Sequence, residues 1–228
     1  VSLLDLRNSG DTAGDPERVV GYGAFALHER PAAPAPSPGA EAAEGPEARA
    51  RRARVITGLA RAAVASLFGG PPPAVPAGEG WLDERRACFV SLHREGALRG
   101  CVGGLEPRGS LYQEVLSCAR AAATRDPRFD PVTPGELEDL ELEVSVLSPV
   151  TPLPAADEAE AVRQLRPGLD GLVLQAAGRG ATFIPAVWEQ LPAPEDFLRQ
   201  LRRKAGLPDA WVPGTRLFRF TAERYREP

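Results

Sequence analysis

ALRGCVGGLE, residues 97–106, combines the features of a β-strand with an unusual number of glycines. Glycine weakens a strand, because it adds chain entropy to the unfolded state and has no side chain to pack. We therefore expect that the backbone bends here or that another group comes close to it. Cys101 lies within this run, two residues after Arg99. The glycines in question are Gly100, Gly103 and Gly104.

The run is expected to form a hairpin with the apolar segment 88–93, and the register of this hairpin places the cysteine. A three-residue loop, Arg94-Glu95-Gly96, is the favoured turn, because it puts glycine at the left-handed position. Its core face would then consist of Cys88, Val90, Leu92, Leu98 and Val102. The other face would carry Ser91, His93, Arg99 and Cys101 together. A two-residue loop would instead put His93 on the face opposite to Cys101.

This polar face predicts a reactive thiol. A positive charge at Arg99 would lower the pKa of the Cys101 thiol below its ordinary value and make it nucleophilic. His93 would carry protons. The flanking glycines would let a substrate or another chain approach the backbone. The alternative is that Cys101 is a small buried hydrophobe, as free cysteines often are; Cys88 and Cys118 are predicted to lie in the core.

The rest of the chain predicts an α+β fold with a mainly antiparallel sheet flanked by helices. Short turns join the expected strands, and helices are interspersed among them. In the strand 140–146, even-numbered residues are expected to be buried and Glu141 and Glu143 more exposed. A buried Glu143 that faced Arg99 or Arg128 would join the site. The other expected elements are helices at 46–68, 110–124 and 194–206, a hairpin at 170–184 and a strand at 217–220.

Composition excludes several classes of protein. The formal net charge of −4 argues against a dedicated nucleic-acid binder. No apolar run approaches the roughly 20 residues of a membrane span, and the start lacks a signal-peptide pattern. Three cysteines without a CxxC motif indicate reduced thiols in the cytoplasm. Neither metal-ligand spacing nor a phosphate or dinucleotide loop is present, so no cofactor or metal is expected.

Six ordered blocks stand out in the body of the chain: LRGCVGG (98–104), ATRDPRFDPVTPGEL (123–137), LEVSVLSP (142–149), GLDGLVL (168–174), ATFIPAVWEQLP (181–192) and FLRQLRRKAGLP (197–208). They follow one another as they do in the AMMECR family, which the chain resembles over about residues 50–226. The prokaryotic members are called AmmeMemoRadiSam system protein A. The resemblance implies a two-lobed α+β fold and gives no established biochemical role. It adds Asp126 as a proton carrier and Arg128 and Phe129 as substrate contacts, presented near the hairpin; the alternative is that Asp126 only caps a turn.

A leader precedes this body. Residues 8–27 resemble the C-terminal end of MEMO-like proteins, so we expect 1–30 to be the remnant of a MEMO-like domain fused upstream. Residues 31–46 form a Pro/Ala-rich linker, and 47–228 form the AMMECR-type domain. The chain lacks methionine and starts at Val1, which suggests an alternative start codon or a piece of a longer protein.

The resemblance implies MEMO-like and radical-SAM proteins as partners. One hypothesis is an enzyme component that uses Cys101 in a substrate cleft. The other is a non-catalytic binding module that docks on those partners, with Cys101 only packed.

Overall fold

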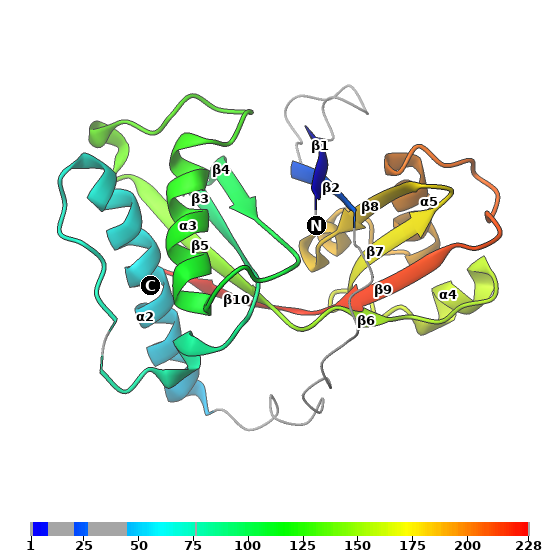
Figure 1. Cartoon of the computed structure of the whole chain (residues 1–228), viewed down its shortest axis with the longest axis horizontal. Coiled ribbons are helices and arrows are strands. Elements are labelled where there is room, and N and C mark those ends of the chain that lie inside the picture. Colours follow the sequence, from blue (N-terminus) through cyan, green and yellow to red (C-terminus); the bar gives the residue numbers. More distant parts are fainter. Residues whose placement is uncertain (1, 9–20, 27–44, 76, 228) are drawn as a thin grey trace. The chain divides into compact units, whose positions relative to one another are not determined.

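The computed structural model describes residues 2–8, 21–26, 45–75 and 77–227 (Figure 1). It confirms the α+β class, because helices alternate with sheets whose strand pairs are antiparallel. The chain divides into two compact units. The first contains Val1–Ala33 and Pro149–Ala222, and the second contains Pro34–Ser148 and Glu223–Pro228.

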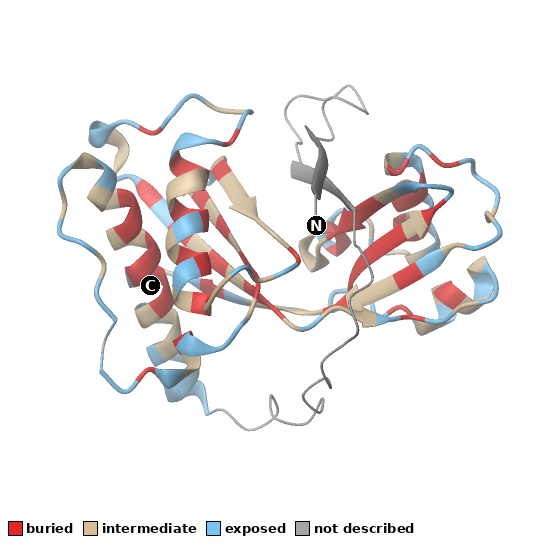
Figure 2. Cartoon of the chain, viewed as in Figure 1, coloured by how far each residue is buried: buried red, intermediate tan, exposed pale blue. Residues whose placement is uncertain are grey.

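The second unit is built on a four-stranded sheet in the order β10-β5-β3-β4. Helices α2 and α3 pack against the same face of this sheet (Figure 1). Their apolar stripes meet alternate residues of the strands, and Figure 2 shows buried residues along these inner faces. The elements are β3 (Cys88–Arg94), β4 (Ala97–Gly103), β5 (Leu140–Leu147), β10 (Ala222–Arg226), α2 (Pro46–Ala65), α3 (Leu111–Thr124) and the short 3₁₀ helices η1 (Ser66–Phe68), η2 (Gly80–Asp83) and η3 (Pro134–Glu136).

The β3–β4 hairpin differs from the predicted register. Its loop has two residues, Glu95 and Gly96, with φ angles of 53° and 76°. Two left-handed residues suit the strand twist better than the predicted three-residue loop. A bulge between Leu92 and His93 leaves Arg99 as the extra residue.

Ser91 therefore lies opposite Cys101. Strand alternation keeps His93 on the face of Ser91 and Cys101, so these three side chains share a face although the expected register is wrong. Leu98 does not join the core face as predicted: the bulge pairs it with His93, and it is only half-buried. The cysteines Cys88 and Cys118 are buried in the core, as predicted.

The strand β5 confirms the predicted alternation, since its even-numbered residues are buried. Its odd-numbered residues point to the face opposite to the helices, where Glu141 is exposed and Glu143 half-buried. We call this side the open face. Its side chains are half-buried or exposed, and they are Phe89, Ser91 and His93 of β3, Cys101 of β4, and Glu141, Glu143 and Ser145 of β5.

The first unit has its own four-stranded sheet, in the order β6-β9-β7-β8. Its core contains Phe197, which stacks on Trp188 at a ring distance of 3.8 Å. The predicted hairpin and the helix that follows it are both present. The elements are β6 (Thr151–Pro152), α4 (Glu158–Gln164), β7 (Gly171–Ala176), β8 (Arg179–Phe183), η4 (Pro185–Glu189), α5 (Pro194–Lys204) and β9 (Arg216–Phe220).

Strands β1 (Ser2–Asn8) and β2 (Gly21–Ala26) pair with each other in a separate two-stranded sheet. The strand expected near residues 19–27 is thus present. Residues 31–44 of the expected linker lie outside the described part of the chain. Among the described helices, none combines the length and apolar character that a membrane span requires.

Candidate functional site

A thiol, a hydroxyl and a carboxylate form one row across the open face. Ser91 on β3 lies opposite Cys101 on one side and Glu143 on the other. The Ser91 hydroxyl donates a hydrogen bond to Cys101 Sγ at 3.2 Å. Side chains directly opposite each other on neighbouring strands have Cβ atoms about 5 Å apart, so Ser91 has Cys101 and Glu143 as its neighbours on this face. We call these three residues the thiol row.

The thiol of Cys101 is less acidic than the sequence suggests. Burial raises its pKa above the ordinary value, and this outweighs the hydrogen bond from Ser91 and the positive charge of Arg128, both of which lower it. The negative charges of Asp126 and Glu143 raise it further. The expected lowering of the pKa is therefore wrong, and the resting thiol is protonated at neutral pH.

Arg99 does not act on the thiol, because its side chain is held elsewhere. Its Nε donates to Glu136 Oε1 at 2.8 Å and its Nη1 to the Asp130 carbonyl at 2.9 Å. The bulge gives Arg99 no partner in the β3–β4 ladder, and the side chain ties β4 to the segment 130–136 instead. Its expected role as the electrostatic partner of Cys101 is not supported by this geometry.

The Arg99–Glu136 pair predicts that part of the free energy of unfolding is lost in acid. Hydrogen bonds from Arg99 and from the Thr133 backbone lower the pKa of Glu136 to about 2. Because the pKa of Glu136 is lower in the folded than in the unfolded state, the ionised carboxylate stabilises the fold at pH values above the ordinary carboxyl pKa. This contribution is lost as the pH falls toward 2. In Arg99→Ala, the free energy of unfolding should therefore decline less between about pH 5 and pH 2 than in the native chain.

Denaturant unfolding at several pH values measures this difference. Arg125→Ala is the control, because Arg125 is exposed at the end of α3 and should leave the pH dependence unchanged. If the free energy of unfolding fell equally with pH in Arg99→Ala and in the native chain, Arg99 would not be the group that lowers the pKa of Glu136.

Asp126 and Arg128 clamp the backbone of Cys101. The strand β4 is at the edge of its sheet, so the outward N–H and C=O of Cys101 need partners. Asp126 Oδ2 accepts the Cys101 N–H at 2.7 Å, and Arg128 Nη2 approaches the Cys101 carbonyl at 3.4 Å. The two side chains also pair with each other at 2.6 Å. The segment after α3 thus completes the edge of the sheet as a further strand would.

The contacts of Asp126 differ from those of a proton carrier, whereas the role of Phe129 as a substrate contact stays a prediction. Burial raises the pKa of Asp126, but hydrogen bonds from Arg128 and from the Cys101 and Arg128 N–H groups outweigh it, so the net pKa is lowered. An ionised, fully engaged carboxylate is a positioning group rather than a proton carrier. The Phe129 ring lies 5.4 Å from the Arg128 guanidinium carbon, in a cation–π contact.

Two of the glycines serve the packing of the chain itself. A Cβ on Gly100 would lie 2.3 Å from the carbonyl oxygen of Ala122 in α3. A Cβ on Gly103 would lie 2.4 Å from the Cys88 carbonyl oxygen and the Phe89 ring. Only at Gly104 is there room, with the nearest atom at 3.9 Å. The close approach expected at Gly100 and Gly103 is therefore made by the chain, which leaves Gly104 as the glycine that could admit a ligand.

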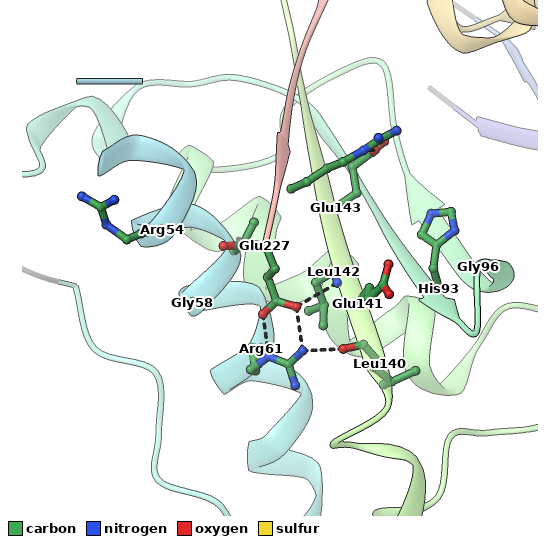
Figure 3. A pocket seen from close by; sticks show the side chains of 12 residues that line it. Arg54, Gly58, Arg61, His93, Gly96, Leu140, Glu141, Leu142, Glu143 and Glu227 are labelled. Carbon is green, nitrogen blue, oxygen red and sulfur yellow. Dashed lines mark hydrogen bonds and ion pairs between the residues drawn. The ribbon is translucent and has the colours of Figure 1, made fainter. Parts of the chain in front are cut away.

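His93 lies with Glu141 and Glu143 in the wall of a cavity of about 900 Å³ (Figure 3). His93 and Glu141 face each other across β3 and β5. Glu143 pairs with Arg226 at 2.6 Å rather than with Arg99 or Arg128. Since Glu143 also belongs to the thiol row, the cavity and the row share a border.

Sequence reasoning missed two partners, Arg226 and Glu136. Arg226 comes from β10, where buried Tyr225 is flanked by exposed arginines, an alternation that could have placed Arg226 on the open face. Nothing local links Glu136 to Arg99. Among the described residues, no group of three His, Cys, Asp or Glu side chains could hold a metal ion.

A family model described as AMMECR1 matches residues 57–225. The chain belongs to the AMMECR1 family. This stretch includes the thiol row, the Asp126–Arg128 clamp and the first unit from Pro149 onward.

Relatives come from archaea and bacteria. A Methanothermobacter thermautotrophicus protein is 40% identical over 63% of this chain and 77% of its own length. A Thermotoga maritima protein is 38% identical over 68% and 85%. The crystal structure of the uncharacterised protein PH0010 from Pyrococcus horikoshii is similar with a TM-score of 0.69, at 32% identity, over 78% of this chain and 92% of that one.

Proposed function

We propose that this AMMECR1-family chain is an enzyme component whose reaction takes place at the Cys101 thiol on the open face. The observation that carries the proposal is the Ser91 hydroxyl 3.2 Å from Cys101 Sγ, in register with Glu143. A cysteine that merely packs needs no polar row, whereas a thiol that ionises during a reaction needs a donor for the thiolate and an acceptor for its proton.

The resting thiol is protonated, so activation is coupled to substrate binding. A hydroxyl can accept one proton and donate another, which allows Ser91 to pass the thiol proton toward Glu143. Ser91 then donates to the thiolate, and the positive charge of Arg128 stabilises it. A substrate that covers the open face would strengthen these interactions by excluding water.

The alternative is a binding module that docks on a MEMO-like protein and a radical-SAM protein, and the clamp favours it. Asp126 and Arg128 hold the Cys101 backbone whether or not the thiol reacts. We propose the same two partners for the enzyme component, with a MEMO-like domain fused upstream through residues 1–30. The proposal places the chain in the cytoplasm, where its thiols stay reduced.

The pH dependence of Cys101 alkylation tests the thiol row. We expect the rate in the native chain to titrate above the ordinary thiol pKa, because burial dominates. Ser91→Ala should move this titration to higher pH, since it removes a donor that favours the thiolate. Glu143→Gln should move it to lower pH, since it removes a negative charge.

Arg99→Ala is the matched control, and it should leave the titration in place because Glu136 holds that guanidinium. Peptide mapping by mass spectrometry after iodoacetamide treatment reports the rate for each cysteine separately. A native titration at or below the ordinary thiol pKa, or identical curves for all three variants, would overturn the proposed activation.

A further inference from the structure

Two of the three cysteines meet in the core of the second unit. Cys88 begins β3, and Cys118 lies on the buried side of α3. The Cys118 thiol approaches the Cys88 carbonyl oxygen, with an Sγ–O distance of 3.8 Å. The two thiols also interact with each other, since a side-chain hydrogen bond with Cys118 is the largest cause that raises the pKa of Cys88. The two side chains are therefore neighbours, although they are 30 positions apart in the sequence.

The backbones that carry these two thiols are packed closely. Helix α3 lies against β3 and β4 (Figure 1), and the absence of a side chain at Gly100 lets the Ala122 carbonyl of α3 approach β4. The Cys88 carbonyl oxygen also accepts the N–H of Gly104 at 3.3 Å, which fixes the start of β3. A disulfide forms only between residues whose Cα atoms are about 4.4–6.8 Å apart. The close approach of helix to sheet is thus a condition for bridging this pair.

The surroundings of the pair select a small oxidant and exclude the third cysteine. Cys88 is 0% exposed and Cys118 is 7% exposed, so Cys118 is the thiol that a small molecule reaches first. Burial and the negative charge of Glu114 also raise the pKa of Cys88, which keeps that thiol protonated at neutral pH. Cys101 lies on the open face, on the other side of the sheet, and cannot reach either core sulfur within the folded chain.

We propose that Cys88 and Cys118 form a modification site at which hydrogen peroxide creates a disulfide between β3 and α3. The Cys118 sulfur attacks one peroxide oxygen, the O–O bond breaks, and water leaves a sulfenic acid on Cys118. The Cys88 sulfur then attacks Cys118 Sγ, the S–O bond breaks, and the released hydroxide takes up the Cys88 proton as a second water. The two thiols lose two electrons in total, and the peroxide gains them. The inference does not depend on the reaction proposed at Cys101.

Peptide mapping without reduction tests the inference, because trypsin places each cysteine in a separate peptide: residues 87–94, 100–108 and 109–120. The folded full chain is treated with hydrogen peroxide, and its remaining thiols are then blocked with iodoacetamide in urea. We expect a disulfide between peptides 87–94 and 109–120. Cys101→Ser should keep this product, and Cys118→Ala should lose it. A core pair that stays reduced while Cys101 is oxidised, or a disulfide that includes Cys101, would overturn the inference.

Urea unfolding of Cys101→Ser shows whether the disulfide fits the native fold. The chain has no methionine, so the two core cysteines are the main targets of peroxide in this variant. A cross-link that fits restricts the unfolded chain, so the oxidised form should unfold at a higher urea concentration than the reduced form. Dithiothreitol should reverse the shift, and Cys118→Ala treated in the same way should show none. An unchanged or lowered midpoint after cross-linking would overturn the inference.

Discussion

Replacing Asp126 by alanine is expected to lower the free energy of unfolding by about 3–5 kcal/mol, the cost of removing one partner of a buried ion pair. The Asp126 side chain is 3% exposed and that of Arg128 is 13% exposed. Without the carboxylate, the guanidinium would remain buried without its counter-charge, and the Cys101 N–H at the sheet edge would lose its acceptor. Urea unfolding followed by circular dichroism measures the change.

Asp126→Asn isolates the charge from the hydrogen bonds, because asparagine keeps one acceptor oxygen. We expect a smaller loss than for alanine. Pro127, next in the chain, is exposed, and Pro127→Ala is the matched control with an expected change within about 0.5 kcal/mol. If Asp126→Ala lowered the free energy of unfolding no more than Pro127→Ala does, the Asp126–Arg128 clamp would not hold β4 in place.

Gly100→Ala is expected to destabilise the fold by roughly 1–3 kcal/mol or more, as overpacking of a well-packed interior does. The new Cβ would lie 2.3 Å from the Ala122 carbonyl oxygen and 3.2 Å from its carbonyl carbon. Both are backbone atoms of α3, which cannot rotate away as a side chain can. The helix would have to move off the sheet, and the buried residues of α3 would lose contacts with it.

Gly104→Ala is the matched control, because its Cβ would meet its nearest atom at an ordinary contact distance of 3.9 Å. The two variants add the same methyl group to the same glycine-rich run. Thermal unfolding should show a lowered midpoint for Gly100→Ala and little change for Gly104→Ala. Similar midpoints would mean that α3 does not require glycine at position 100.

Local signals predicted much of the fold. The helix expected from residue 110 is present as α3, and it starts with a capping box in which the side chains of Ser110 and Gln113 each accept a hydrogen bond from the other's backbone N–H. Alternation along β5 correctly identified its buried face. The hairpin register was predicted wrongly, because a bulge can absorb a residue and no sequence pattern marks Arg99 as the residue that it displaces.

The site was harder to predict, because its charges find partners far along the chain. The sequence placed Cys101 and Ser91 on one face, but it gave Arg99 the role that Arg128 fills. Arg99 reaches Glu136, 37 positions away, and Glu143 pairs with Arg226, 83 positions away. Spacing along one strand indicates which side chains share a face. Tertiary contacts decide which charged groups lie near a thiol and in which direction they shift its pKa.

Competitive labelling of the three cysteines in the native chain tests most directly whether Cys101 lies at an accessible site. Cys88 and Cys118 are 0% and 7% exposed in the core, whereas Cys101 is half-buried on the open face. We expect iodoacetamide at alkaline pH to modify Cys101 alone, and the two core thiols to react only after unfolding in urea. Equal protection of all three cysteines in the folded chain would contradict a site at Cys101.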